Sequence, residues 1–342
     1  MVLVRRLFVS GLLSLVSGCS GGSAEPAPAA PTWLDSAEGE LPSTMSELGL
    51  YRLPKLSATH ARAVPYVPRY ELWSNGSEKE RFLLLPPDTS IDNSTAGSWD
   101  FPAGSLLFKT FSAPRVLGDT LTGSQPLETR VLRRSATRWD YAVYLWNDAG
   151  TDAELTDITV THPVTVELEG ERFDHVVPAK LDCRKCHEAQ ESTVIGVDEL
   201  NLSAPLEGGG TEQLLTWHAA GRLLEPPTLP APVAHEDATT QRVLEYLEGN
   251  CTHCHNGGTG ASSAFDLRHD VALANLINRE TEGEAVAGIR VVPGEPDESA
   301  LYLALSRTAV ARDVQPMPPV GVQRADAAAI ALVRKWILEL SP

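Results

Sequence analysis

Residues 251–255 read C-T-H-C-H, and residues 183–187 read C-R-K-C-H. Both stretches have the form C-x-x-C-H, in which two cysteines stand one short turn apart and a histidine follows the second directly. The 342-residue chain has five cysteines, of which these two stretches contain four, and the fifth is Cys19. No cysteine of the C-terminal half is left over for a disulfide, so the repeated pattern decides how that half is interpreted.

The C-x-x-C-H pattern is the attachment signature of haem c. Two thiols one short turn apart can reach the two vinyl groups on one edge of a porphyrin and form thioethers. The adjacent histidine then lies beneath the ring with an imidazole nitrogen on the iron. We therefore expect two covalently bound haem c groups, each with a histidine as proximal iron ligand. The first would be held by Cys183, Cys186 and His187, and the second by Cys251, Cys254 and His255.

Two other chemistries use the same thiols. A C-x-x-C pair can be a thioredoxin-like redox centre, but such centres begin a helix in a βαβ unit, and the sequence shows no such unit. Two C-x-x-C pairs can also hold a structural zinc ion, which would make the chain a binding module. Zinc would leave the histidine after each second cysteine unexplained, and thiols are poor zinc ligands in an oxidising compartment.

The segment 237–342 places helical patterns around the second C-x-x-C-H stretch. We expect Thr239 or Thr240 to cap a helix whose apolar face carries Val243, Leu244 and Leu247. A last helix is expected over about residues 325–340. Its apolar stripe consists of Ile330, Val333, Trp336, Ile337 and Leu340.

Met317 lies between these helices in residues 315–319, which read Q-P-M-P-P, and it follows His255 by 62 positions. The flanking prolines stiffen the segment, which suits holding a thioether sulfur against iron. The order of helix, C-x-x-C-H, middle helix, Met-Pro-Pro and final helix resembles class I cytochrome c. The resemblance implies that His255 is the proximal ligand and Met317 the distal ligand of the second haem, a pair that raises the reduction potential. An iron with six ligands has no open position, so this haem is expected to pass electrons rather than bind a substrate.

The segment 179–236 carries the first C-x-x-C-H stretch but no methionine, so the sixth ligand of its iron stays open. His218, on a helix expected from about residue 211 to 224, is the local candidate for the distal position. The other candidates are His162, His175, His235, Met45, and an iron with water or no sixth ligand. Two histidines would give a lower potential than the His/Met pair, whereas an open iron would permit peroxide or small-ligand chemistry.

Residues 45–178 differ in composition from the rest of the chain. Short runs rich in Val, Leu, Tyr, Trp and Phe alternate with polar residues and are punctuated by Pro and Gly. The runs are residues 81–85, 105–111, 128–134, 138–146 and 162–168. Because no long helical period appears, the pattern predicts an antiparallel β-sandwich.

Several stretches of this β domain carry a second resemblance. They are residues 71–76 (E-L-W-S-N-G, with Lys79 and Arg81 after it), 99–104 (W-D-F-P-A-G), 109–111 (K-T-F), 128–130 (E-T-R) and 146–149 (W-N-D-A). Together with the C-x-x-C-H stretches they resemble a family of largely uncharacterised bacterial dihaem c-type cytochromes with a β domain before the two haem motifs. The resemblance covers residues 45–342 and implies this architecture and a redox role, but no substrate. The family pattern has Asp where this chain has Asn75, which weakens any metal or acid–base role there.

Four cations of the β domain could form a site for an anion or a haem propionate. They are Lys79, Arg81, Lys109 and Arg130. The alternative is that they form salt bridges across the sheet with Glu71, Glu80 and Glu128. The chain as a whole has a formal net charge of −17, which excludes nucleic acid as a partner, because phosphate binding needs a basic surface.

The N-terminus has the form of a processing signal. Arg5 and Arg6 precede an apolar run over residues 7–16, which is too short to span a bilayer. Residues 16–19 read V-S-G-C and resemble the bacterial lipobox, which implies that Cys19 is lipidated and becomes the mature N-terminus. Residues 20–32 are rich in Ser, Gly, Ala and Pro and read as a tether. We expect an exported protein that is lipid-anchored to the outer membrane and faces the periplasm or the cell surface.

The expected order of parts follows from these observations. It consists of a signal peptide (1–19), a linker (20–44), a β-sandwich domain (45–178), a first haem c module (179–236) and a class I cytochrome c-like domain (237–342). The fold class is multidomain β plus α, with two small, mostly helical haem modules. We expect a dihaem lipoprotein that transfers electrons between redox protein partners and touches the membrane only through its lipid. The alternative is an oxidoreductase in which an open first haem, or a substrate in the β domain, passes electrons through the second haem.

Overall fold

A computed structural model describes residues 33–36, 39–52, 59–156, 162–189, 192–206, 211–258, 265–282, 288–307 and 314–341. The predicted signal peptide, the tether and Cys19 lie outside these residues. Residues 32–342 form one compact unit, and the predicted boundaries after residues 178 and 236 fall inside it. Within the described ranges, no helix combines the length and the apolar character that crossing a membrane requires.

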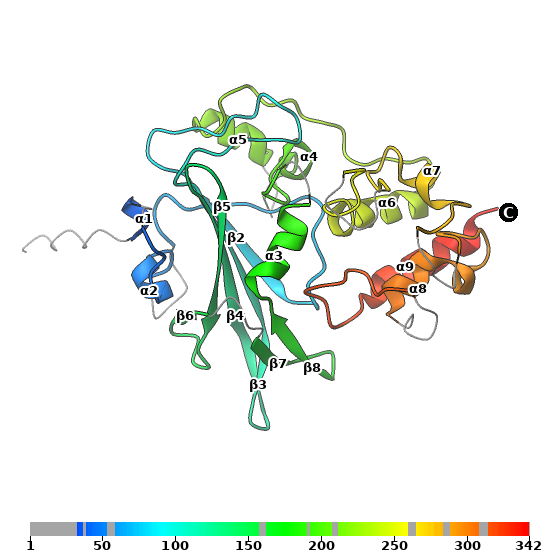
Figure 1. The fold of residues 1–342 in the computed structure, drawn as a ribbon, viewed down its shortest axis with the longest axis horizontal. Helices are drawn as coiled ribbons and strands as arrows, with labels where there is room; N and C mark the ends of the chain where they lie inside the picture. The colour runs from blue at the N-terminus through cyan, green and yellow to red at the C-terminus, as the bar shows by residue number, and fades with distance from the viewer. Residues whose placement is uncertain are drawn as a thin grey trace, which may run out of the picture. The chain divides into compact units, whose positions relative to one another are not determined.

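An antiparallel sheet forms the first half of this unit (Figure 1). In the described residues it has eight strands, and β1 to β6 are hydrogen-bonded in sequence order. The strands are β1 (Val64–Pro65), β2 (Glu78–Leu84), β3 (Leu106–Leu117), β4 (Thr120–Arg134), β5 (Trp139–Trp146), β6 (Ala153–Leu155), β7 (His162–Leu168) and β8 (Glu171–Val177). The hairpin of β7 and β8 branches from β3 through the pair Arg115 and Val166. The predicted mixture of an antiparallel sheet followed by helices is thereby confirmed.

Side chains alternate between two faces of the sheet, as strand geometry requires. On one face, Leu106 and Phe108 of β3 pack with α1 (Trp33–Ser36) and α2 (Met45–Leu48). On the other face, Leu107 packs with α4 (Glu199–Leu202) and α5 (Gln213–Ala219), and Val143 packs with β7 and β8. The sheet is therefore covered on both sides, and its second face is the one that meets the rest of the chain.

A buried chain of hydrogen bonds fixes the first face. The Tyr51 and Thr110 hydroxyls lie 2.7 Å apart, Thr110 Oγ1 lies 2.7 Å from Thr129 Oγ1, and the Trp146 indole donates to Thr129 Oγ1 at 2.9 Å. Thr129 is fully buried, so its hydroxyl has no water to replace these partners.

Thr129→Val is expected to destabilise the protein by about 1–3 kcal/mol, the usual cost of leaving buried polar partners unsatisfied. The variant keeps the shape of the side chain but deprives the Trp146 N–H of its acceptor. Urea unfolding measures the change. Thr165→Val, on an exposed hydroxyl that bonds Asp174, is the control. Equal stability of the two variants would contradict the expectation.

The named elements after β8 are all helical in the described residues. After β8 come α3 (Lys180–His187), α4, α5, α6 (Ala238–Asn250), α7 (Ala272–Leu276), the 3₁₀ turn η1 (Pro296–Glu298), α8 (Ala300–Ser306) and α9 (Ala327–Glu339). Helices α6 and α9 pack together through Val243, Leu247, Val333, Trp336 and Ile337. These residues belong to the two predicted apolar stripes, which are thereby confirmed. The cap of α6 is Asp237, which accepts from the Thr240 N–H at 2.7 Å, rather than Thr239 or Thr240.

Candidate functional site

The first C-x-x-C-H stretch lies on α3, directly after the sheet. Cys183, Cys186 and His187 are all half-buried, and the helix ends at His187. The Asp182 carboxylate accepts from the Ala179 N–H at 3.3 Å, which fixes the start of the helix just after β8. The sheet thus positions the two thiols and the imidazole on one short helix.

The ring of His187 is oriented by a backbone carbonyl. Its Nδ1 lies 2.7 Å from the Thr193 carbonyl oxygen, and because a carbonyl only accepts, Nδ1 carries the proton. Burial lowers the pKa of His187 to about 4, and the Thr193 hydrogen bond offsets only part of this. The imidazole is therefore neutral at pH 7 with a lone pair on Nε2. A histidine that donates through Nδ1 and leaves Nε2 free is the usual form of a metal ligand.

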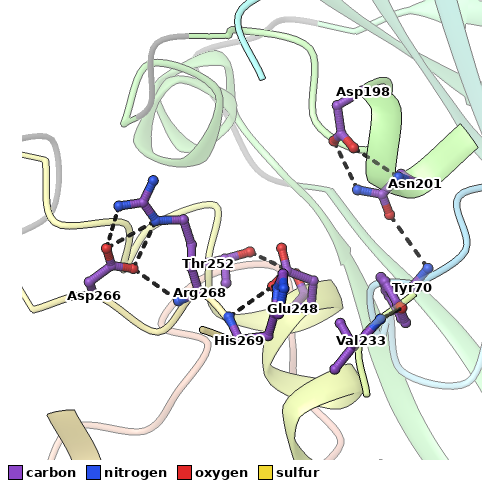
Figure 2. A network of polar contacts seen from close by, with 9 residues as sticks. All are labelled: Tyr70, Asp198, Asn201, Val233, Glu248, Thr252, Asp266, Arg268 and His269. Atoms are coloured by element: carbon purple, nitrogen blue, oxygen red, sulfur yellow. Dashed lines mark hydrogen bonds and ion pairs between the residues drawn. The ribbon is translucent and has the colours of Figure 1, made fainter. Parts of the chain in front are cut away.

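The second C-x-x-C-H stretch continues from the end of α6. The Cys251 carbonyl accepts from the N–H groups of Cys254 at 3.1 Å and His255 at 2.8 Å, so the motif closes into a tight turn. Thr252 donates its hydroxyl to the Glu248 carbonyl at 2.7 Å. Figure 2 shows this contact, and it also shows the Glu248 carboxylate, which lies 3.2 Å from Nδ1 of His269. The motif is thereby tied to the last turn of the helix that precedes it.

A cavity of about 500 Å³ adjoins this second motif. Cys251, Cys254 and His255 line it, and so does Met317, whose own N–H donates to the Ala304 carbonyl at 3.1 Å. The remaining wall is largely apolar and includes Tyr246, Phe265, Leu267, Leu276, Leu301 and Leu305. The structure therefore brings the two thiols, the imidazole and the predicted distal thioether to one cavity.

A smaller cavity of about 140 Å³ adjoins the first motif. Cys183, Cys186 and His187 line it together with the second face of the sheet. The Tyr141 ring lies 5.7 Å from the His187 ring, measured between centroids. Three of the four cations singled out in the sequence also line this cavity, namely Arg81, Lys109 and Arg130.

The two motifs meet at the boundary between the cavities. Cys186 and His253 line both of them. Possible ligand atoms of Cys186, His253 and Cys254 all lie within 4.8 Å of one another, and the contacts with Cys254 and His253 lower the pKa of Cys186. This group draws on both stretches and is not itself a C-x-x-C-H pattern. The juxtaposition is invisible in the sequence, where 67 residues separate the two cysteines.

The other candidate ligands for the first motif lie elsewhere. His218 is on α5 and is not among the described residues that line either cavity. His175 bonds the Glu128 carboxylate at 2.7 Å, and His235 accepts from the Asp237 N–H at 3.0 Å. Met45 is fully buried on the first face of the sheet. The His162 side chain lies outside the described residues.

Ion pairs account for part of the cation cluster. Glu71 lies 3.7 Å from the Lys79 ammonium and 3.4 Å from the Arg81 guanidinium, and Glu128 lies 2.7 Å from Arg130. The predicted pairing with Glu71 and Glu128 is thereby confirmed. Burial raises the pKa of Glu128, but Arg130 and a hydrogen bond from His175 outweigh it and lower the pKa to about 2.

Asn75 joins the sheet to the C-terminal segment, a role that sequence reasoning missed. Its amide nitrogen donates to Gln323 Oε1 at 2.8 Å, and its oxygen accepts from the N–H groups of Gln323 at 2.8 Å and Arg324 at 3.0 Å. The backbone of Asn75 is left-handed, with φ of 58°, a region that Asn tolerates. An Asp carboxylate could not donate the hydrogen bond to Gln323, so the structure explains why an amide stands at this position.

The donor set fits a haem c group at the second motif most directly. Two thiols, a histidine and a thioether line one largely apolar cavity, which is the chemistry that covalent attachment and two axial bonds require. At the first motif the thiols and the oriented imidazole fit the same attachment, with no described thioether in the cavity. Comparisons with protein-family models, with curated proteins and with solved structures gave no match.

Proposed function

We propose that this protein is a dihaem c-type cytochrome that transfers electrons. The observation that carries the proposal is that Met317, 62 positions beyond His255, lines the same cavity as the second C-x-x-C-H motif. A structural zinc site or a dithiol centre gives no reason for a thioether in the same cavity as the histidine, whereas an axial pair on haem iron does.

The residues of the chain have defined parts in this proposal. Cys251 and Cys254 would hold the second haem, His255 and Met317 would ligate its iron, and Cys183, Cys186 and His187 would hold the first. Haem iron supplies the one-electron chemistry. The apolar wall of the larger cavity excludes water, burial keeps the His187 ring neutral, and the Thr193 carbonyl fixes the orientation of the ring.

The close approach of the two C-x-x-C-H motifs supports electron transfer between the two haem sites. Cys186 and Cys254 belong to different motifs, yet their sulfur atoms lie within 4.8 Å of each other. The two attachment points are therefore adjacent, and the chain brings both cofactors to one place. An internal electron path then needs no long stretch of intervening protein.

The finer architecture and the location belong to the same proposal. The two helical parts around the motifs would be cytochrome c-like modules, the second of class I type, and the β domain would be a sandwich of the dihaem family described above. Cys19 would carry the lipid that anchors the exported protein to the outer membrane. Redox proteins of the periplasm or cell surface would then be its partners.

Mass spectrometry tests the proposal directly. Protein made in a host competent for cytochrome maturation is expected to carry two haems on its intact mass, and the haem stain should survive denaturation because thioethers are covalent. Protein that carries neither tetrapyrrole under these conditions would refute the proposal. Peptide mapping assigns each haem to residues 183–187 or 251–255.

One observation favours a second candidate, a protein that binds a metal ion through mixed thiol and imidazole ligands. Cys186, His253 and Cys254 converge closely enough to share one ion, and thiolate with imidazole is a ligand set that zinc accepts. In this case the purified protein would contain about one equivalent of zinc and no haem. Metal analysis alongside the mass measurement separates the two candidates.

A further inference from the structure

Three cations stand side by side across three strands of the sheet. Arg81 of β2 is paired in register with Lys109 of β3, and Lys109 is paired with Arg130 of β4. Residues directly opposite each other on adjacent strands have neighbouring side chains on the same face. All three line the cavity at the first motif, so they form a row, Arg81–Lys109–Arg130, that faces α3.

The face that carries this row is apolar toward one end of the strands. The next pair of residues on the same face, Leu83 and Leu107, is buried against α4 and α5. Val143 of β5, directly opposite Arg130, is buried against β7 and β8, and in the other direction the face continues with Lys79, Phe111 and Glu128. Like charges directly opposite one another destabilise a sheet, and a buried charge is costly unless it is paired. The row of three adjacent cations therefore needs a negative group beside it to offset the repulsion between the charges.

The carboxylates paired with these cations are fewer than the cations, and Asp182, which also lines the cavity, pairs with Lys185 instead. Glu71 and Glu128 are the carboxylates paired with the four clustered cations, Lys79 and the row. Among the described side chains, Lys109 has no hydrogen bond or ion pair, and its Nζ lies over the Phe111 ring, 4.9 Å from the ring centroid. Burial and the neighbouring guanidinium groups hold the pKa of Lys109 well below its usual range. The central member of the row is thus the one without a counter-charge.

We propose that the row Arg81–Lys109–Arg130 binds a carboxylate group, with Lys109 as its central contact, in the cavity beside the first C-x-x-C-H motif. Adjacent ammonium and guanidinium donors match the two oxygens of a carboxylate. Tyr66, Leu107 and Val194 also line the cavity, and they suit an apolar skeleton bearing the acid. The carboxylate has two possible sources, a propionate of the first haem or a free organic acid. The first source rests on the proposed function, and the second does not.

Lys109→Met tests the proposal, because it keeps the length of the side chain and removes the charge. Lys185→Met is the matched control, since Lys185 is an exposed cation on α3 and sits outside the cavity lining. Succinate is the probe for a free acid, titrated into the full-length protein and followed by the melting temperature and, where haem is present, by the Soret band. The midpoint potential of the first haem is the readout for a propionate.

Two outcomes support the proposal. Succinate binding to the wild type that weakens about tenfold or more in Lys109→Met, but not in Lys185→Met, assigns the site to a free acid. If succinate does not bind, a shift in the first haem's potential several times larger in Lys109→Met than in Lys185→Met, and largely restored in Lys109→Arg, assigns it to a propionate.

One result overturns it: no succinate binding together with equal shifts in Lys109→Met and Lys185→Met. In protein that carries no haem the proposed function has failed, and the succinate arm alone decides the carboxylate site. Succinate binding that weakens in Lys109→Met but not in Lys185→Met then supports the site, and any other result overturns it.

Discussion

A chain carrying both Cys251→Ala and Cys254→Ala is expected to lose one of two haems and most of the ordered packing around α6 and α9. The cavity of about 500 Å³ lies inside the cluster of apolar residues that holds these helices together. A void costs about 24 cal/mol per Å³, so even a fifth of this space left empty would cost about 2 kcal/mol. That is a large fraction of the roughly 5–15 kcal/mol that stabilises a domain.

Intact mass and thermal unfolding followed by circular dichroism measure the two effects. The matched control is Cys183→Ala with Cys186→Ala, which removes the thiols beside the smaller cavity of about 140 Å³. The control is expected to lose the other haem while α6 and α9 keep their melting transition. A double variant at residues 251 and 254 that retains two haems, or that melts like the wild type, would contradict the assignment.

The sequence predicted best where a pattern is local. The apolar stripes of α6 and α9 repeat with the helical period, and the structure buries them as expected. The runs at residues 81–85, 105–111 and 138–146 coincide closely with β2, β3 and β5. Helix α5 ends earlier than expected, at Ala219, since Gly221 adopts a φ of 70° that leaves the helix.

The far end of the hairpin of β3 and β4, beyond the predicted runs 105–111 and 128–134, was missed because of its prolines. Pro114 and Pro126 read as breaks in a strand, yet β3 continues to Leu117 and β4 begins at Thr120. The pairing shifts register between Phe111 and Ser112 and between Pro114 and Val116. Such irregularities tolerate residues that cannot donate to the ladder, so proline marks a bulge here rather than an end.

The site itself was predicted in its parts but not in its arrangement. Each C-x-x-C-H stretch is complete in sequence, so its chemistry can be interpreted without a fold. The approach of Cys186 to Cys254 depends on how α3 leaves the sheet and where α6 ends. The cation row depends on strand register, which sets Lys109 between Arg81 and Arg130 and which no local pattern contains.

Met317→Leu is expected to lower the midpoint potential of the second haem by about 100 mV or more, because axial ligands tune haem potentials over about 0.8 V. A thioether favours the reduced iron, and leucine offers no donor atom. Leucine has nearly the same volume as methionine, so packing against Ala300, Leu303 and Ala304 should be retained. The methionine–iron charge-transfer band should disappear in the same variant.

The other internal methionine supplies the control for this change. Met45→Leu alters a fully buried residue on the first face of the sheet, which lies away from both cavities. It therefore tests the general effect of replacing a methionine sulfur in a core. Its spectrum and both potentials are expected to match the wild type within error. The two variants together distinguish ligation from packing: a band that persists in Met317→Leu, or potentials that move equally in both variants, would remove Met317 from the iron. The larger cavity would then still hold a haem on Cys251, Cys254 and His255, but with a sixth position supplied by another group.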